Sequence, residues 1–234
     1  MTSVSYGHTI HVVTEDYPPY NFKENDSIVG VSTEVVRAVL KEAGFEVNIL
    51  LYPWPRAYNM ALENENTIIY SISRTSERET LFKWIGVVAP ADNYLFALKK
   101  RTDITIQTLD EAKKYMIGTV RDDVADLYLI GKGFEVIKHI ERASNYELNM
   151  KKLIGGRIDL WFAAELVGNF FLKKNGYVPE ETVRKVYMLD EISGEGLYMA
   201  FSKKTSDHTV EICKKALEKI KQNGTYSLIL KKHL

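Results

Sequence analysis

The feature that most constrains the fold is an alternation of short apolar strand patterns with amphipathic helix patterns, which occurs twice along the 234 residues. The first set ends near residue 98, where the polar stretch KKRTD (99–103) interrupts it, and the second ends at the glycine-containing segment EISGEG (191–196). Such alternation indicates an α/β fold with largely parallel sheets flanked by helices. If both interruptions are crossovers, residues 99–193 form a second lobe inserted into a first lobe made of 1–98 and 194–234.

The expected elements follow from hydrophobic periodicity and from helix start and stop signals. Strands are expected at 8–14, 47–52, 67–73, 94–99, 116–120, 134–140, 157–162, 183–189 and 197–202. Helices are expected at 32–43, 54–63, 165–174, in the stretch SERETLF (76–82), from Asp122, after a capping box of Ser144 with Glu147, and from about 203 to 222.

Composition excludes several classes of partner. Lysine and arginine number 31, as do aspartate and glutamate, and there is no basic stripe, which argues against nucleic acid and an anionic membrane surface. No apolar run approaches the length of a membrane span. The beginning, MTSVSYGHTIHVV, lacks a charged segment followed by an apolar one, so we expect no export signal in this sequence. The single cysteine, Cys213, cannot form an internal disulfide.

Aromatic and charged residues gather just after the expected strands. In open α/β sheets ligands bind beyond the carboxyl ends of the strands, so these positions are candidates for a binding site. Aromatic walls with a few placed charges suit a small polar ligand, and an arginine can hold a carboxylate by two parallel hydrogen bonds. The candidates at these positions are Glu15, Tyr17, Trp54, Arg56, Arg78, Arg121, Asp122, Asp123 and Glu165.

The order of several short motifs resembles the bacterial extracellular solute-binding proteins, and more narrowly family 3, the polar amino-acid type that serves ABC importers. The matching pieces are YPPY (17–20), GVSTE (30–34), SISRTSER (71–78), IGTV (117–120) and GRID (156–159). The combination of PWPRAY with SRTSERETLFKWIG is similar to one subgroup of that family. The resemblance covers almost the whole chain.

The resemblance implies a two-lobe fold of the type II periplasmic-binding-protein class, in which each lobe is a mostly parallel sheet flanked by helices and two strands form the hinge. It implies that Arg78 holds an α-carboxylate, that Ser71 and Ser73 contact the polar head of the ligand, and that Tyr17 and Trp54 cover its side chain. It further implies a periplasmic or extracellular monomer with a removed signal, an ABC permease as partner, and no cofactor or catalysis.

Two positions of the second lobe depart from the family pattern. The aspartate that pairs with an α-amino group is replaced by Ala164, and the Gly-[Ser/Thr] pair that binds the carboxylate is replaced by Asp122-Asp123. A carboxylate at that place would repel an anionic ligand group and favour a cation. The sequence therefore predicts a ligand that differs from an ordinary L-α-amino acid.

Seven of the candidates also have a purely structural interpretation. Arg78 could pair with Glu77 or Glu79, Arg56 could pair with Glu63, Trp54 and Tyr17 could pack in a core, and Asp122, Asp123 and Glu165 could be helix-start acids. Two other functions remain open: a sensor module of a receptor, and a dehydratase of cyclic acids in which Glu165 or Glu15 acts as general acid. No nucleotide-binding, hydrolase or metal-protease motif is present.

Overall fold

The computed structural model describes residues 10–233 and divides the chain into two compact units. Unit 1 comprises Met1–Pro90 with Leu197–Leu234, and unit 2 comprises Ala91–Gly196. The first crossing therefore lies earlier than the expected boundary at 98/99. The reason is strand pairing, because β7 (Asn93–Leu98) hydrogen-bonds with two strands of unit 2 and with none of unit 1.

The sheet of unit 1 has five strands in the order β4-β1-β5-β12-β6. Their bounds are β4 Ile49–Leu51, β1 His11–Thr14, β5 Thr67–Ser73, β12 Leu197–Ser202 and β6 Phe82–Ala89. β4, β1 and β5 are parallel, whereas β12 is antiparallel to both β5 and β6. The sheet is thus mixed rather than mostly parallel, because the chain returns from unit 2 in the opposite direction.

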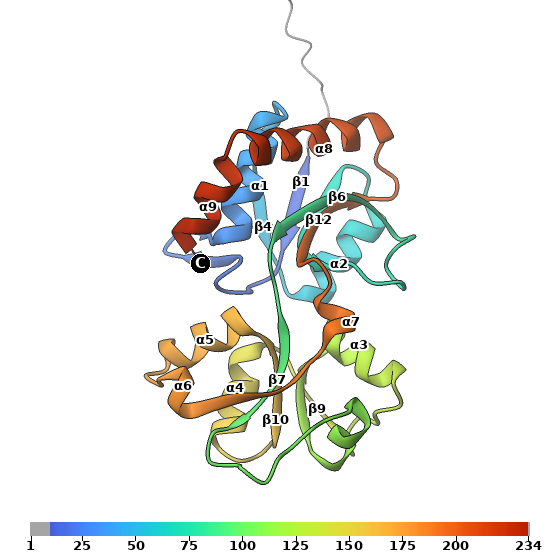
Figure 1. Cartoon of the computed structure of the whole chain (residues 1–234). Coiled ribbons are helices and arrows are strands. Elements are labelled where there is room, and N and C mark those ends of the chain that lie inside the picture. The colour runs from blue at the N-terminus through green and yellow to red at the C-terminus, as the bar shows by residue number, and fades with distance from the viewer. Residues whose placement is uncertain (1–9, 234) are drawn as a thin grey trace, which may run out of the picture. The chain divides into compact units, whose positions relative to one another are not determined.

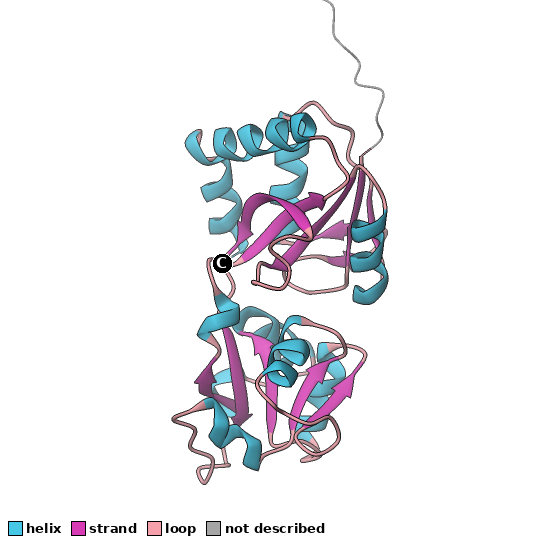
Figure 2. Cartoon of the chain, turned by 90° about the vertical axis from the view of Figure 1, so that its right-hand side faces the viewer, coloured by secondary structure: helices cyan, strands magenta, loops and turns pink. Residues whose placement is uncertain are grey.

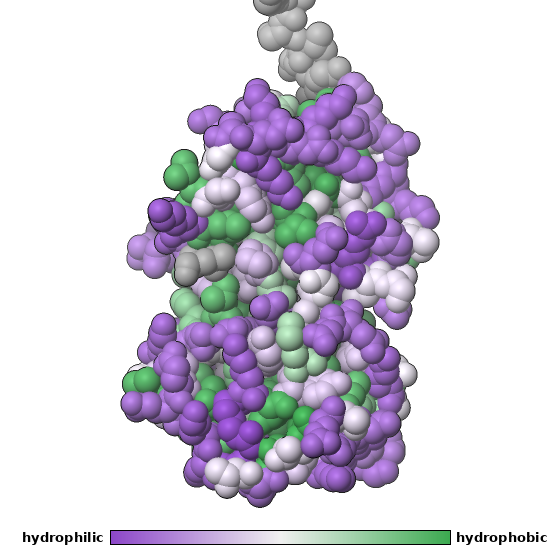
Figure 3. Space-filling view, viewed as in Figure 1, coloured by the Kyte–Doolittle hydropathy of each residue, from purple (hydrophilic) through white to green (hydrophobic). Residues whose placement is uncertain are grey.

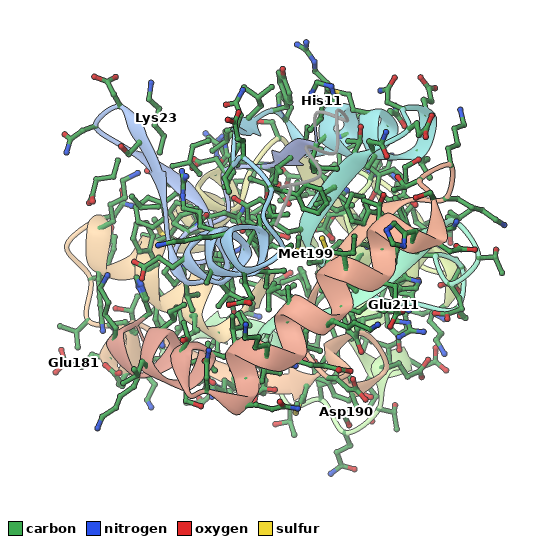
Figure 4. All side chains as sticks on the ribbon, turned by 90° about the horizontal axis from the view of Figure 1, so that it is seen from above. His11, Lys23, Glu181, Asp190, Met199 and Glu211 are labelled. Atoms are coloured by element: carbon green, nitrogen blue, oxygen red, sulfur yellow. The ribbon has the colours of Figure 1, made fainter. Side chains whose placement is uncertain are left out.

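Side-chain alternation along these strands feeds two separate apolar clusters, one on each face of the sheet. One face packs against α1 (Val31–Glu42) and α8 (Asp207–Gln222), and α9 (Thr225–His233) contacts both helices, so the three stand together in Figure 1. The other face packs against α2 (Trp54–Glu63). Figure 4 shows Met199 of β12 beneath α8, while Glu211 lies on the outer side of that helix. The outer surface over α8 is hydrophilic in Figure 3.

The YPPY turn and the start of α1 hold each other through backbone hydrogen bonds. The carbonyl oxygen of Pro19 accepts the N–H of Val31 at 3.1 Å, and that of Tyr20 accepts the N–H of Ser32 at 2.9 Å. Gly30 precedes α1 with φ +113°, and a Cβ there would lie 2.4 Å from the Tyr20 oxygen. Two motifs of the family resemblance are therefore one packed unit, completed by the hairpin β2 (Phe22–Glu24) and β3 (Ser27–Val29).

The sheet of unit 2 also has five strands, in the order β11-β7-β10-β8-β9. Their bounds are β11 Val183–Met188, β7 Asn93–Leu98, β10 Leu160–Ala164, β8 Ile117–Val120 and β9 Ile140–Ala143. β10, β8 and β9 are parallel, and β7 is antiparallel to both of its neighbours. This sheet too is mixed.

Helices cover the sheet of unit 2 on both sides, as they do in unit 1 (Figure 2). They are the 3-10 helix η1 (Leu109–Lys114), α3 (Val124–Gly131), α4 (Tyr146–Ile154), α5 (Glu165–Lys174), α6 (Pro179–Thr182) and α7 (Asp190–Ser193). In the GRID motif, Asp159 accepts hydrogen bonds from Arg101 at 2.7 Å and from the N–H of Met116 at 3.1 Å. That motif therefore fixes the loop after β7.

Several expectations about secondary structure were wrong. Residues 134–140 are not a strand, because Ile137 takes φ +76° and the strand begins only at Ile140. The stretch 76–82 is a turn rather than a helix, and Phe82 already belongs to β6, which we did not expect. Helices α1 and α4 start from Gly30 and Asn145 rather than from Ser32 and Ser144. The expected strand 8–14 lies partly outside the described residues.

Candidate functional site

In unit 1 the parallel strands β4, β1 and β5 end at one edge of the sheet. The N–H of Tyr52, just after β4, donates to the carbonyl oxygen of Thr14 at the end of β1, 2.9 Å away. Glu15 is half-buried and follows β1, and its carbonyl oxygen accepts from the amide of Asn21 at 2.7 Å. Residues after these strands are therefore neighbours in space.

Arg78 is buried at this edge, with 5% of its surface exposed. Its Nη1 donates to the carbonyl oxygen of Ser73 at 3.2 Å, and its guanidinium carbon lies 5.4 Å from the ring centre of Trp54 and 5.3 Å from that of Tyr58. A guanidinium over aromatic faces is stabilised by cation–π attraction and keeps its orientation. Trp54 is also a core residue, as its structural interpretation foresaw.

Ser71 lies at a β-bulge. β12 pairs Tyr198 with Ile72 and Met199 with Tyr70, so Ser71 is the extra residue, with φ +58°. Its buried hydroxyl has no hydrogen-bond partner within the described part of the chain. Bulges re-aim side chains and often lie beside binding sites. Ser73 contributes the carbonyl that holds Arg78.

Tyr17 is buried and stacks on Tyr20, with ring centres 5.3 Å apart. The hydroxyl of Tyr20 donates to the carbonyl oxygen of Pro90 at 3.0 Å, which fixes the pair within unit 1. Arg56 is exposed, and its guanidinium carbon lies 4.2 Å from the ring centre of Tyr52. Its structural interpretation was instead an ion pair with Glu63.

In unit 2 the loop between β8 and α3 is fixed by hydrogen bonds to a buried carboxylate, that of Asp126. This side chain is fully buried and accepts from Thr119 at 2.9 Å, from the N–H of Asp122 at 3.0 Å, and from Arg142 at 2.9 Å. Arg142 also pairs with its other oxygen at 2.8 Å. The network fixes Asp122, which is exposed and takes φ +60°.

Asp123 is the N-cap of α3, the helix-start role that its structural interpretation gave. Its Oδ1 accepts from the N–H of Ala125 at 2.6 Å, and its Oδ2 accepts a short hydrogen bond from the hydroxyl of Tyr146. The carboxylate therefore supplies its own negative charge to the positive end of the helix. Arg121 is exposed, and its N–H donates to the carbonyl oxygen of Ala143.

Glu165 opens α5 and forms an ion pair with Lys185 of β11, at 2.5 Å. The ammonium of Lys185 also lies 4.5 Å from the ring centre of Tyr94. Glu165 is about one third exposed, so it is not the buried, unpaired carboxyl that a general acid requires. Ala164, beside it, is fully buried.

Several residues outside the set of candidates organise the two groups of loops: Tyr58, Arg74, Asp126, Arg142, Tyr146 and Lys185. Tyr58 could have been found from its spacing, because it lies one helical turn after Trp54. The others are brought in by strand pairing and helix packing. Within residues 10–233 there is no group of metal-ligating side chains, and no helix there combines the length and apolarity needed to cross a bilayer.

The profile of the bacterial extracellular solute-binding proteins, family 3, matches residues 10–234. The chain belongs to this family. A probable histidine-binding protein of Campylobacter jejuni is 24% identical over 223 residues, covering 93% of this chain and 81% of that protein.

Solved structures show the same fold. One is an ancestral arginine-binding protein bound to arginine, with a TM-score of 0.81, 23% identity and coverage of 97% of this chain and 98% of the other. Another is a histidine kinase sensor domain similar to periplasmic binding proteins, with a TM-score of 0.85, 20% identity and coverage of 97% and 96%. The chain thus has the two-lobe type II periplasmic-binding-protein fold.

Proposed function

We propose that this family 3 protein is an extracytoplasmic binding protein for a small amino-acid-like ligand, which it takes up between its two lobes for an ABC importer. The observation that carries the proposal is Arg78, a guanidinium held at the carboxyl edge of three parallel strands by Ser73, Trp54 and Tyr58. Such an orientation suits bidentate binding of a carboxylate.

The second unit supports a ligand whose other end is not a carboxylate. The family pattern has a Gly-[Ser/Thr] pair at the start of α3, where this chain has Asp122-Asp123. Asp123 is the N-cap of the helix, and Asp122 beside it is exposed. A second anion there would meet like charge at close range. Relatives named for histidine and arginine make cationic amino acids the first ligands to test.

The test is a thermal-shift panel on ligand-stripped protein, with L-arginine, L-histidine, L-glutamine, L-glutamate and putrescine as probes. A ligand at a hundredfold excess over its Kd stabilises the folded state by about 2.7 kcal/mol. We expect a shift with a cationic amino acid that Arg78→Ala abolishes. Such a hit would overturn the prediction from Ala164 and Asp122-Asp123 that the ligand differs from an ordinary L-α-amino acid. A shift that persists in Arg78→Ala would remove Arg78 from the site, and no shift with any probe would contradict the amino-acid proposal.

The importer and the extracytoplasmic location are further parts of the proposal. Release of the protein by osmotic shock of its host, with cytoplasmic markers retained, would support them. The dehydratase alternative requires turnover of a prephenate-like acid that Glu165→Gln abolishes, and the ion pair with Lys185 argues against that role.

A further inference from the structure

The loop that carries Arg78 contains a second arginine, Arg74, which the proposed ligand site does not use. Arg74 directly follows β5, and its guanidinium reaches Glu79. Nε donates to Oε2 at 2.7 Å and Nη2 donates to Oε1 at 2.6 Å. This bidentate pair joins the two ends of residues 74–79, and the hydrogen bond from Arg78 to Ser73 closes the same loop a second time.

Both members of the pair are also attached to the sheet. The guanidinium carbon of Arg74 lies 5.4 Å from the ring centre of Trp84 on β6 and 5.5 Å from that of Tyr198 on β12. The indole Nε1 of Trp84 donates to the carbonyl oxygen of Glu79 at 3.1 Å. The residue after Arg78 in the chain is therefore held by its side chain and by its backbone.

A continuous series of ring contacts connects the two arginines. Neighbouring ring centres are 5.4–5.8 Å apart along the order Trp54, Tyr58, Phe82, Trp84, Tyr198. Arg78 lies over the first two rings and Arg74 over the last two. Aromatic pairs at such distances resist sliding because their rings interlock in tilted geometry.

We propose that Arg74 and Glu79 are positioning residues, whose ion pair holds the 74–79 loop so that the Arg78 guanidinium is oriented before a ligand arrives. The importance of this orientation for binding rests on the proposed function. Affinity is reduced by the cost of ordering side chains and loops on binding, and a loop that is already ordered avoids that cost. Arginine suits the role because its planar fork can bind a carboxylate and stack on rings at the same time.

The competing explanation is an ordinary surface ion pair, which contributes little to stability and nothing to binding. Arg74 and Glu79 are 39% and 48% exposed, so their replacement should leave unit 1 folded. The two explanations differ in what happens at Arg78. Only a positioning pair changes the dynamics of that side chain.

The experiment compares Glu79→Gln with the control Glu65→Gln, which removes the same charge from an exposed position of unit 1 outside the loop. The readout is hydrogen exchange of the Arg78 Nε–H by side-chain NMR, which requires no ligand. We expect exchange to be about tenfold faster in Glu79→Gln, as local opening becomes easier, and to be unchanged in Glu65→Gln. Equal exchange in Glu79→Gln and wild type would overturn the proposal.

A second variant, Arg74→Lys, keeps the charge but loses the fork and the ring stacking, so it should accelerate exchange to an intermediate extent. If a panel probe binds wild type, its Kd should rise about three- to tenfold in Glu79→Gln and stay within about twofold in the control Glu65→Gln. If Glu79→Gln lowers the Tm but leaves the exchange of Arg78 and the Kd unchanged, the ion pair only stabilises the fold. That outcome would contradict the positioning role. If no probe binds, the proposed function fails, while the exchange measurement still decides the role of Arg74 and Glu79.

Discussion

Arg78 donates a hydrogen bond from Nη1 to the carbonyl oxygen of Ser73, 3.2 Å away, and thereby ties the loop after β5 back to the strand that precedes it. The bond fixes the position of the guanidinium relative to the end of β5. The side chain remains largely buried against aromatic rings, where a charge-assisted bond to a ligand would be stronger than in water.

The first prediction concerns the geometry of this anchor. Arg78→Lys keeps the positive charge but cannot donate two parallel hydrogen bonds, so the Kd for a carboxylate ligand should rise at least about tenfold. Isothermal titration calorimetry with the probe that binds most tightly in the panel measures this Kd. Arg37→Lys is the control, because that exposed arginine of α1 is not among the site candidates, and we expect a much smaller change there. Equal affinity of Arg78→Lys and wild type would show that bidentate geometry is not used.

The second prediction concerns the buried pair in unit 2. Asp126→Asn should lower the free energy of unfolding by about 3 kcal/mol, because it leaves Arg142 without its charge partner in a buried setting. Urea denaturation followed by circular dichroism measures the change. Asp110→Asn removes the same charge from an exposed pair with Lys113 and should change stability by less than about 0.5 kcal/mol. Similar effects of the two variants would contradict the prediction.

The third prediction concerns Gly30. Gly30→Ala places a Cβ 2.4 Å from the carbonyl oxygen of Tyr20 at φ +113°, so the YPPY turn or α1 must move, at a cost of about 2 kcal/mol. Gly156→Ala is the matched control, since its φ is +67° but nothing lies within 4 Å of the added atom. Thermal unfolding should show the larger loss for Gly30→Ala. The reverse order would mean that the turn adapts without cost.

The fourth prediction concerns pH. Hydrogen bonding to Lys151, opposed by partial burial and assisted by Lys174, lowers the pKa of Glu147 from 4.5 to about 2. A depressed folded pKa contributes stability above the unfolded value of 4.5, and this is lost as pH falls through about 2. Glu147→Gln should therefore be less stable than wild type by about 0.5–1 kcal/mol at pH 7, with the gap closing near pH 2. A gap that does not depend on pH would exclude the ionised carboxylate as its source.

Much of the architecture could be predicted from particular residues. Hydrophobic patterns located β5, α1, α2, α5 and α8 within a few residues, because β5 is a continuous buried run and each of the helices buries one face. Prediction failed where local signals were misleading. The charged stretch 76–82 looks helical, yet residues 76–81 form a turn in which the carbonyl oxygen of Glu79 accepts from Trp84 of β6.

The candidate site shows the same division between local signals and long-range contacts. Position after a strand was enough to predict Arg78 and Asp123 as site candidates, whereas Ser73, the last residue of β5, was predicted from the family resemblance. The partners of the charges were not predictable, because Glu79 pairs with Arg74, Glu165 pairs with Lys185 of a distant strand, and Asp123 caps its own helix. An ion pair requires two side chains to meet within a few ångströms, and neither composition nor spacing encodes that distance.

The sequence by itself determined the α/β class, the two sets of strands and helices and the family, since these depend on periodicity and on short motifs along the chain. Only the tertiary structure decided which side chains meet. Strand order brought β6 and β12 beside the loop after β5, so that five rings and two arginines from separate segments form one series of contacts. The physical reason is that periodicity specifies which face of a helix or strand is buried. The order in which strands pair within a sheet specifies which side chains that face contacts.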